Sequence, residues 1–310
     1  MKRRTKDEGM GTQATDHDAR RAVAIDYFRR LDAGREMIDL FGEHAEIHFP
    51  KWGIARGHKE IQQMWSEVGV LYRSISHFSE FLNYAFDDSL VFVEGLSDGV
   101  AGDGTPWIGG QTWAGRWCDV MEIRDGKIER LYIYLDPDYA GADTGRYPWI
   151  TDGLPPVAQT LSAPAQKQYT PMTDYERAAL VRDYFQRLDS GVPVEELFAD
   201  HATSYYPKWG VAHGAAAVGQ QHRDVAAAYP QISHVSEYLN IVVDGEVVAV
   251  EGLTVGTTVD GTSWRAGQNL SGRFCAIFEV RDYAIERCFT YLDPDLADAD
   301  FARYPWLTSN

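Results

Sequence analysis

Apolar residues in the first part of the chain recur at helical spacing. Between about Asp18 and Asp32 they fall three or four residues apart, which predicts an amphipathic helix that Gly34 ends. Three further elements are expected before residue 75: a short helix, a strand and a helix, at 36–41, 45–49 and 58–72. The strand should end at Pro50 and the turn-prone Trp52-Gly53.

From residue 75 the pattern changes to long stretches of strand character. Four strands are expected, at roughly 75–86, 89–98, 105–124 and 127–135. Asp87-Asp88 and Asp125-Gly126 fit hairpin turns between neighbouring strands. Helices followed by an antiparallel meander predict an α+β fold, in which the helices cover one face of a curved sheet.

The whole pattern occurs twice. Ile-Ser-His-Phe-Ser-Glu-Phe-Leu-Asn at 75–83 returns as Ile-Ser-His-Val-Ser-Glu-Tyr-Leu-Asn at 232–240, an offset of 157 residues (234 − 77). The same offset relates Pro-Lys-Trp-Gly at 50–53 to 207–210, so one domain has been duplicated. Four regions follow in chain order: a tail expected to be disordered, a first domain, a Pro-rich linker and a second domain, at 1–15, 16–151, 152–172 and 173–310.

The repeated segment is predicted to be a strand with an unusual face. Alternation places four side chains of the first copy on one side: His77, Ser79, Phe81 and Asn83. The corresponding residues of the second copy are His234, Ser236, Tyr238 and Asn240. Imidazole, hydroxyl and carboxamide groups are unusual for a plain core and suit the wall of a pocket with polar groups at its tip.

Composition and net charge disfavour two classes of binding partner. A formal net charge of −17 and a pI of about 4.9 argue against nucleic acid and anionic membranes, because binding phosphates needs clustered Lys and Arg. The three cysteines, Cys118, Cys275 and Cys288, have neither disulfide-framework nor zinc spacing. No apolar run suits a signal peptide or a membrane span, so a cytoplasmic location is expected.

Two short motifs resemble a known superfamily. Tyr-Phe-Arg-Arg-Leu-Asp-Ala-Gly at 27–34 and Asp-Gly-Lys-Ile-Glu-Arg at 125–130, in this element order, resemble the nuclear transport factor 2-like superfamily. Within it the chain is most similar to the SnoaL-like group of polyketide cyclases and to ketosteroid isomerases, scytalone-type dehydratases and limonene-type epoxide hydrolases. The resemblance covers nearly all of 20–150 and 177–308, and it is specific for the fold.

The resemblance implies two tandem, cone-shaped α+β half-barrels, each wrapped around a hydrophobic cavity beneath its helices. Such domains often dimerise through the outer face of the sheet. The two copies are therefore expected to form an internal pseudo-dimer, and a further homo-oligomer is left open.

His77 and His234 resemble the catalytic histidine of the dehydratases. An imidazole titrates near neutrality and can take up and return a proton. The structural alternative is a buried histidine that is satisfied by a backbone carbonyl or by a strand neighbour such as Asn83.

Asp136 and Asp293 close the last strand of each copy and resemble the acid/base carboxylate of the cyclases and epoxide hydrolases. They are expected on the same side as Tyr134 and Tyr291, where an aromatic pocket would raise the carboxyl pKa. The alternative is a strand-ending aspartate that caps a turn before a proline.

Tyr27 and Tyr184 match the tyrosine that donates to the enolate oxygen in ketosteroid isomerases; the alternative role is packing alone. Asp119 aligns with the second oxyanion donor of those enzymes, although Ala276 takes its place in the second copy.

Other features of these relatives are missing. Phe49 and Tyr206 stand where the isomerases have their general base, so steroid-type isomerisation is disfavoured. The Arg and Asp pair of the epoxide hydrolases is absent from 94–98, so epoxide hydrolysis is less favoured.

Several aromatic residues recur in both copies and are expected in the core or interface, with some at the cavity mouth: Trp52, Trp209, Trp107 and Trp264. Together with Phe81, Tyr238, Asn83, Asn240, Tyr134 and Tyr291 they are the candidate substrate-binding residues. His44 and His48 lack a third ligand, so no metal is predicted, and no Gly-rich loop supports a nucleotide cofactor.

The sequence thus predicts a cofactor-free acid/base enzyme of secondary metabolism, a cyclase, dehydratase or isomerase, that acts on an apolar, oxygenated small molecule. The alternative from another class is a non-catalytic binding or interaction module of the same fold. Because Asp119 becomes Ala276 and Trp65 becomes His222, we hypothesise that the two copies do not act identically.

Overall fold

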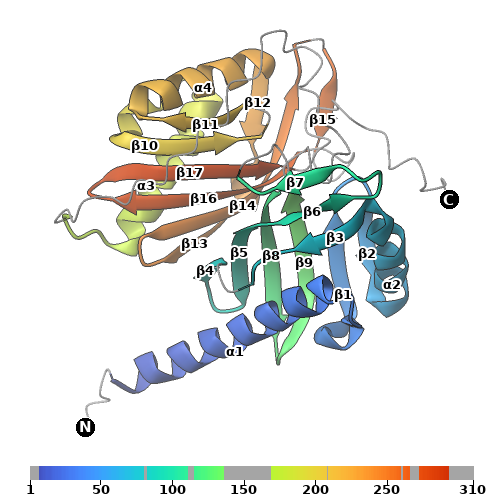
Figure 1. Ribbon diagram of the computed structural model, residues 1–310. Helices are drawn as coiled ribbons and strands as arrows, with labels where there is room; N and C mark the ends of the chain where they lie inside the picture. The colour runs from blue at the N-terminus through green and yellow to red at the C-terminus, as the bar shows by residue number, and fades with distance from the viewer. Residues whose placement is uncertain are drawn as a thin grey trace.

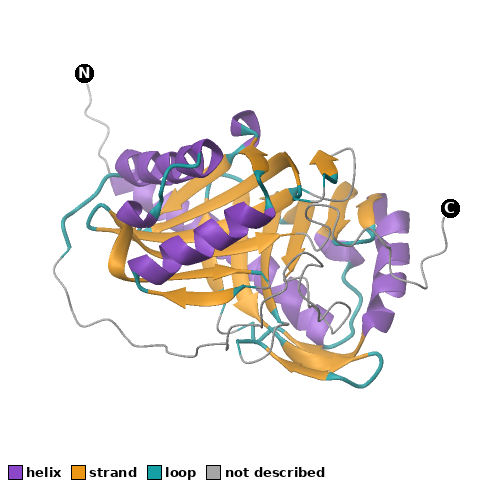
Figure 2. Ribbon diagram, turned by 90° about the horizontal axis from the view of Figure 1, so that it is seen from above, coloured by secondary structure: helices purple, strands orange, loops and turns teal. Residues whose placement is uncertain are grey.

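The computed structural model describes residues 7–79, 82–110, 115–135, 169–207, 209–259, 261–265 and 272–292, with side chains from residue 16 onward. Figures 1 and 2 show two α+β domains in tandem, here called the first half (7–135) and the second half (169–292). Each carries helices on one face of a curved, mainly antiparallel sheet, which confirms the predicted fold class.

The first half contains two helices, two 3₁₀ helices and nine strands within the described residues. The helices are α1 (Asp7–Asp32), η1 (Ile38–Leu40), α2 (Gly57–Val68) and η2 (Gly69–Leu71). The strands are β1 (Phe41–Phe49), β2 (Gly53–Arg56), β3 (Tyr72–Ser76), β4 (Asn83–Phe86), β5 (Leu90–Leu96), β6 (Asp98–Ala101), β7 (Pro106–Ile108), β8 (Arg116–Arg124) and β9 (Lys127–Leu135).

The described part of the second half repeats this order. Its helices are α3 (Asp174–Ser190), η4 (Glu195–Leu197), α4 (Ala215–Ala228) and η5 (Ser236–Tyr238). Its strands are β10 (Phe198–Tyr206), β11 (Gly210–His213), β12 (Gln231–His234), β13 (Asn240–Asp244), β14 (Val247–Thr257), β15 (Ser263–Arg265), β16 (Arg273–Arg281) and β17 (Ala284–Leu292). A capping box of Thr173 and Glu176 begins α3, as the sequence predicts.

Helix α1 is longer than the pattern predicts. It begins at Asp7 rather than near Asp18, so it extends into the segment 1–15 that was expected to be disordered. Among the described helices, none has the length and apolarity needed to cross a membrane.

The predicted strand 75–86 is wrong, because the chain changes sheets within it. Phe78 has a left-handed φ of 47°, which breaks the alternation after β3. β3 pairs with β6 in a three-stranded sheet, whereas β4 pairs with β5 in the main sheet. His77 and Asn83 therefore do not share one face.

The predicted strands 89–98 and 105–124 are divided in the same way, into β5 and β6 and into β7 and β8. Gly115 lies at this corner with a φ of 98°, and its carbonyl accepts a hydrogen bond from Ser97 at 2.8 Å. A side chain at residue 115 would place its Cβ 2.4 Å from the Ser97 carbonyl oxygen, so only glycine fits.

The main sheet of each half is covered on both faces. Trp117 and Met121 of β8 pack in a core with α1 and α2, while Cys118 and Val120 between them pack against the other half. One residue pair also joins the two sheets, Leu135 at the end of β9 with Leu292 at the end of β17. The continuous burial of β8 follows from this double covering.

The contact between the halves is nearly twofold symmetric. Glu94 of the first half receives two hydrogen bonds of 2.8 Å from Arg287 and one of 2.7 Å from the Tyr291 hydroxyl. Glu251 receives the same three bonds from Arg130 and Tyr134. Each of these residues corresponds to its counterpart by the 157-residue offset, for example 251 − 94 = 157.

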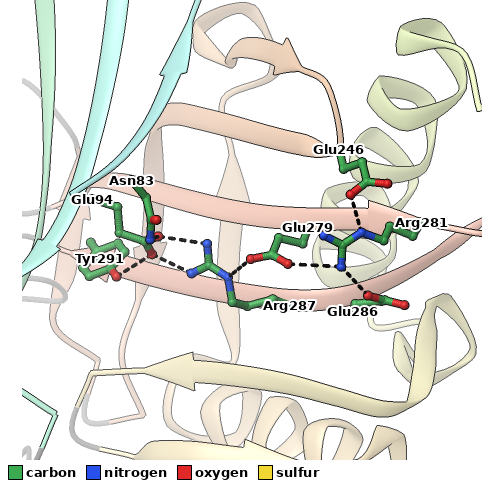
Figure 3. A network of polar contacts seen from close by, with 8 residues as sticks. All are labelled: Asn83, Glu94, Glu246, Glu279, Arg281, Glu286, Arg287 and Tyr291. Atoms are coloured by element: carbon green, nitrogen blue, oxygen red, sulfur yellow. Dashed lines mark hydrogen bonds and ion pairs between the residues drawn. The ribbon is translucent and has the colours of Figure 1, made fainter. Parts of the chain in front are cut away.

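The Glu94 ion pair belongs to a longer network in the second half, shown in Figure 3. Arg287 also contacts Glu279, which contacts Arg281. Burial alone would raise the pKa of Glu94, but Arg287 holds it below its usual value, so this carboxylate is ionised. On the axis of the contact, Cys118 Sγ lies 3.3 Å from Cys275 Sγ.

Candidate functional site

An aspartate ends the first helix of the first half. α1 stops at Asp32, and Gly34 follows with a left-handed φ of 60°. The Asp32 carboxylate accepts two hydrogen bonds from the residue after β3, one from the His77 backbone N–H at 2.9 Å and one from His77 Nδ1 at 2.6 Å. The imidazole is therefore held both through its backbone and through its ring.

The second half repeats this arrangement. Asp189, at the end of α3, lies 2.7 Å from Nδ1 of His234 and 3.0 Å from its backbone nitrogen. Asp189 corresponds to Asp32 by the repeat offset (189 − 32 = 157). The imidazole–carboxylate pair is thus part of the duplicated scaffold.

Aromatic rings enclose the imidazole of the first half. The centroid of the His77 ring lies 5.3 Å from those of Phe28 and Trp117, and its side chain is 9% exposed. Because the ionised Asp32 oxygen accepts, Nδ1 carries a proton, and Nε2 is the ring nitrogen left to exchange a proton with a bound molecule. Nε2 has no hydrogen-bond partner among the described residues, so it can take a proton from a bound molecule.

Two further polar groups of the first half lie beneath the helices. Tyr27 on α1 is fully buried, and its hydroxyl has no hydrogen-bond partner in the described part of the chain. Asp119 on β8 is 3% exposed, and burial raises the pKa of its carboxyl well above the usual value. Burial and then Asp119 raise the pKa of Tyr27, so the Tyr27 hydroxyl is a neutral donor, and the raised pKa of Asp119 favours the protonated carboxyl, which can also donate.

The corresponding tyrosine of the second half is already bonded. Tyr184 Oη lies 2.8 Å from Nε2 of His222 and 3.8 Å from Sγ of Cys288. Ala276 stands where the first half has Asp119, so this half has no second carboxyl donor at that position. The halves share the imidazole–carboxylate pair and differ in the groups around the tyrosine.

A sequence model of the SnoaL-like domain matches residues 24–131 and again residues 181–288. The chain belongs to the SnoaL-like family. The two matches are offset by 157 residues (181 − 24), so the SnoaL-like domain is present twice in tandem. A search of curated proteins finds no match.

Solved structures similar to one SnoaL-like half include three bacterial proteins. A candidate polyketide cyclase from Sinorhizobium meliloti is 17% identical with a TM-score of 0.30, and the match covers 36% of this chain and 93% of that one. A nuclear transport factor 2-like protein from Burkholderia xenovorans is 19% identical with a TM-score of 0.36, covering 43% and 100%. A candidate polyketide cyclase from Xanthomonas campestris is 16% identical with a TM-score of 0.35, covering 41% and 98%.

Four of the predicted substrate-binding residues lie in the contact between the two SnoaL-like halves. The hydroxyls of Tyr134 and Tyr291 donate to Glu251 and Glu94 of the opposite half. Asn83 and Asn240 each donate to the glutamate of their own half, Glu94 and Glu251, at 3.3 Å. Their prediction as pocket residues is wrong, because alternation turns Tyr134 to the opposite face of the sheet and the break at 77–82 removes Asn83 from the His77 face.

Three tryptophans that were candidate substrate-binding residues use their indole N–H groups in hydrogen bonds within the protein. Trp107 donates to Ser97 Oγ at 3.3 Å, and Trp264 donates to Thr254 Oγ1 at 3.0 Å. Trp52 donates to Glu67 at 2.6 Å. Two further candidate substrate-binding residues differ in exposure. Trp209 is buried against Tyr206 and Tyr229. Tyr238 is 60% exposed and does not line a buried wall.

Three predicted site residues, Asp136, Asp293 and Phe81, lie outside the described residues, and the roles expected for them stay predictions. In the described ranges, no group of three His, Cys, Asp or Glu side chains is arranged to hold a metal ion.

Sequence reasoning missed Asp32 and Asp189 as the partners of the two histidines. Both are visible in the repeat as the last acidic residue of the first helix, 45 positions before each histidine (77 − 32 and 234 − 189). Helical and strand periodicity relate only neighbouring residues, so they do not indicate a contact over this separation.

Proposed function

We propose that the first SnoaL-like half is an acid/base enzyme that removes a proton next to the carbonyl group of an apolar, oxygenated small molecule. Cyclisation, dehydration and isomerisation all begin with this step. The observation that carries the proposal is the His77–Asp32 pair, whose free Nε2 is enclosed by aromatic rings.

In the proposed step, Nε2 of His77 takes the proton and the C–H electron pair moves into the enolate. The Asp32 carboxylate stabilises the imidazolium that forms, because it already accepts from Nδ1 at 2.6 Å. The Tyr27 hydroxyl and the neutral Asp119 carboxyl would donate hydrogen bonds to the enolate oxygen, where negative charge develops. Positioned proton transfer of this kind is typically worth about 10²–10⁴ in rate.

The second half is proposed to have a structural or interaction role. Its His234–Asp189 pair is present, but the Tyr184 hydroxyl is bonded to His222 and Ala276 supplies no donor. These two differences favour the non-catalytic alternative for this half alone.

The proposed step can be measured before the natural substrate is identified. Protein in D₂O is mixed with a panel of bicyclic aromatic ketones, and deuterium uptake next to the carbonyl is followed by mass spectrometry. We expect exchange with the native chain, a loss of about 10²–10⁴ in rate for His77→Gln, and little change for the matched His234→Gln variant. Equal exchange by native protein and His77→Gln would remove histidine from the mechanism.

A further inference from the structure

The buried side-chain groups of the first half that lack a hydrogen-bond partner within the described residues include three donors of its helix-side core. They are the Tyr27 hydroxyl and the indole N–H groups of Trp65 and Trp117. Buried polar groups are nearly always paired in folded proteins, since an unpaired one has lost its hydrogen bonds to water. A cluster of such donors therefore needs an explanation.

The second half shows which group a side chain at the position of residue 65 can contact. Trp65 on α2 corresponds to His222 on α4 (222 − 65 = 157), and Nε2 of His222 lies 2.8 Å from the Tyr184 hydroxyl. The ring centroids are 5.6 Å apart in the second half and 6.2 Å apart between Tyr27 and Trp65. The residue at this position therefore lies next to the tyrosine of the first helix in both halves.

The chemistry of the two side chains differs at this point. Nδ1 of His222 donates to the Val218 carbonyl at 2.8 Å, so Nε2 is the acceptor for the Tyr184 hydroxyl. Burial lowers the pKa of His222, which keeps the ring neutral and able to accept. An indole N–H can only donate, so Trp65 cannot accept a hydrogen bond from the Tyr27 hydroxyl. Neither donor has a hydrogen-bond partner among the described residues.

We propose that Trp65 is a third donor to a ligand oxygen bound beside Tyr27 and Asp119, and that His222 closes the equivalent position of the second half. The chain then binds one ligand, not two. The ligand oxygen must accept several hydrogen bonds and donate none, and a carbonyl, enolate or phenolate oxygen meets this requirement. This inference rests on the proposed function only in placing the ligand at the site of the first half.

Binding of 4-nitrophenol to the full chain tests the proposal, because its ionisation is visible by absorbance. The titration is done at a pH where the free phenol is mostly protonated, so that binding to donors produces the phenolate signal. We expect one equivalent per chain. Trp65→Phe should lower the affinity about tenfold or more, because one bond to a charged oxygen is lost, and the matched His222→Phe should leave it unchanged.

A second readout follows ligand binding in the native chain itself. In a ¹H–¹⁵N spectrum of the native chain, the indole N–H signal of Trp65, assigned by its loss in Trp65→Phe, should move when 4-nitrophenol is added. Two equivalents, no binding, an unmoved Trp65 signal or an unchanged affinity of Trp65→Phe would each overturn the proposal.

The proposed function can fail separately. His77→Gln should lose proton exchange and still bind one equivalent of 4-nitrophenol. If this variant kept full exchange while Trp65→Phe lost affinity, the catalytic role of His77 would be wrong and the donor role of Trp65 would stand.

Discussion

The two halves have the same fold and the same imidazole–carboxylate pair, but they differ in what surrounds the first-helix tyrosine. The Tyr27 hydroxyl has no hydrogen-bond partner among the described residues, whereas Tyr184 has His222 as its acceptor. The charged residues that pair across the contact between the halves are instead alike, such as Glu94 and Glu251.

The reason for this difference lies in symmetry. Each contact across the pseudo-twofold axis occurs twice, so a change at Arg130 or Arg287 leaves a buried glutamate of the other half unpaired. A residue beneath the helices touches only its own half. The site can therefore diverge after duplication, while the interface is constrained.

The largest difference between the halves should appear when the aspartate of each pair is changed. Asp32→Asn keeps the size of the side chain but no longer stabilises an imidazolium, and we expect proton exchange to fall about 10²-fold or more. The matched change Asp189→Asn should leave exchange nearly unchanged. Rates from both variants, with circular dichroism to verify folding, decide the comparison; equal losses would show that both halves work.

Replacing either of the two arginines that pair across the interface should destabilise the folded chain. Arg287→Met leaves Glu94 without its cation, and Arg130→Met does the same to Glu251. Breaking a buried pair from one side costs about 3–5 kcal/mol in the free energy of unfolding. Urea unfolding of both variants measures this cost, and a change below about 1 kcal/mol in either would contradict the symmetric description.

Asp119 should oppose folding at neutral pH, in contrast to Ala276. The carboxyl pKa of Asp119 is higher in the folded chain than in the unfolded chain. The contribution of Asp119 to the free energy of unfolding is therefore fully favourable below the unfolded pKa, and it is lost as the pH rises through the folded pKa. Asp119→Asn should therefore be more stable than the native chain at pH 7, because the amide has no ionised form that burial disfavours. The gain should vanish near pH 3, and thermal unfolding across this range would detect it.

The smallest effect is expected at His48, whose counterpart is Tyr205. Burial, and then Arg273 of the other half, lower the pKa of His48 to about 3, so the unfolded chain binds more protons below its ordinary pKa. Stability from this residue is present above about pH 6.5 and falls as the pH drops toward 3. Between pH 7 and pH 6 the loss is under about 1 kcal/mol, and His48→Tyr should remove it in matched urea titrations.

The local sequence pattern was enough to predict many of the helices, strands and turns. The turn at Asp125 and Gly126 is a hairpin in which both residues have positive φ, 50° and 73°, as their residue types favour. The strand containing His77 could not be predicted correctly, because its break depends on pairing with β6 and β5 in two different sheets.

The sequence by itself determined the duplication and the α+β class, because periodicity and repetition can be read along the chain, and it predicted His77 as a site residue. Only the tertiary structure decided that Asp32 holds this histidine, that Tyr134 faces the other half and that His222 satisfies Tyr184. These contacts join residues far apart in the chain, and the folded arrangement of helices and sheets is what brings their atoms within hydrogen-bond distance.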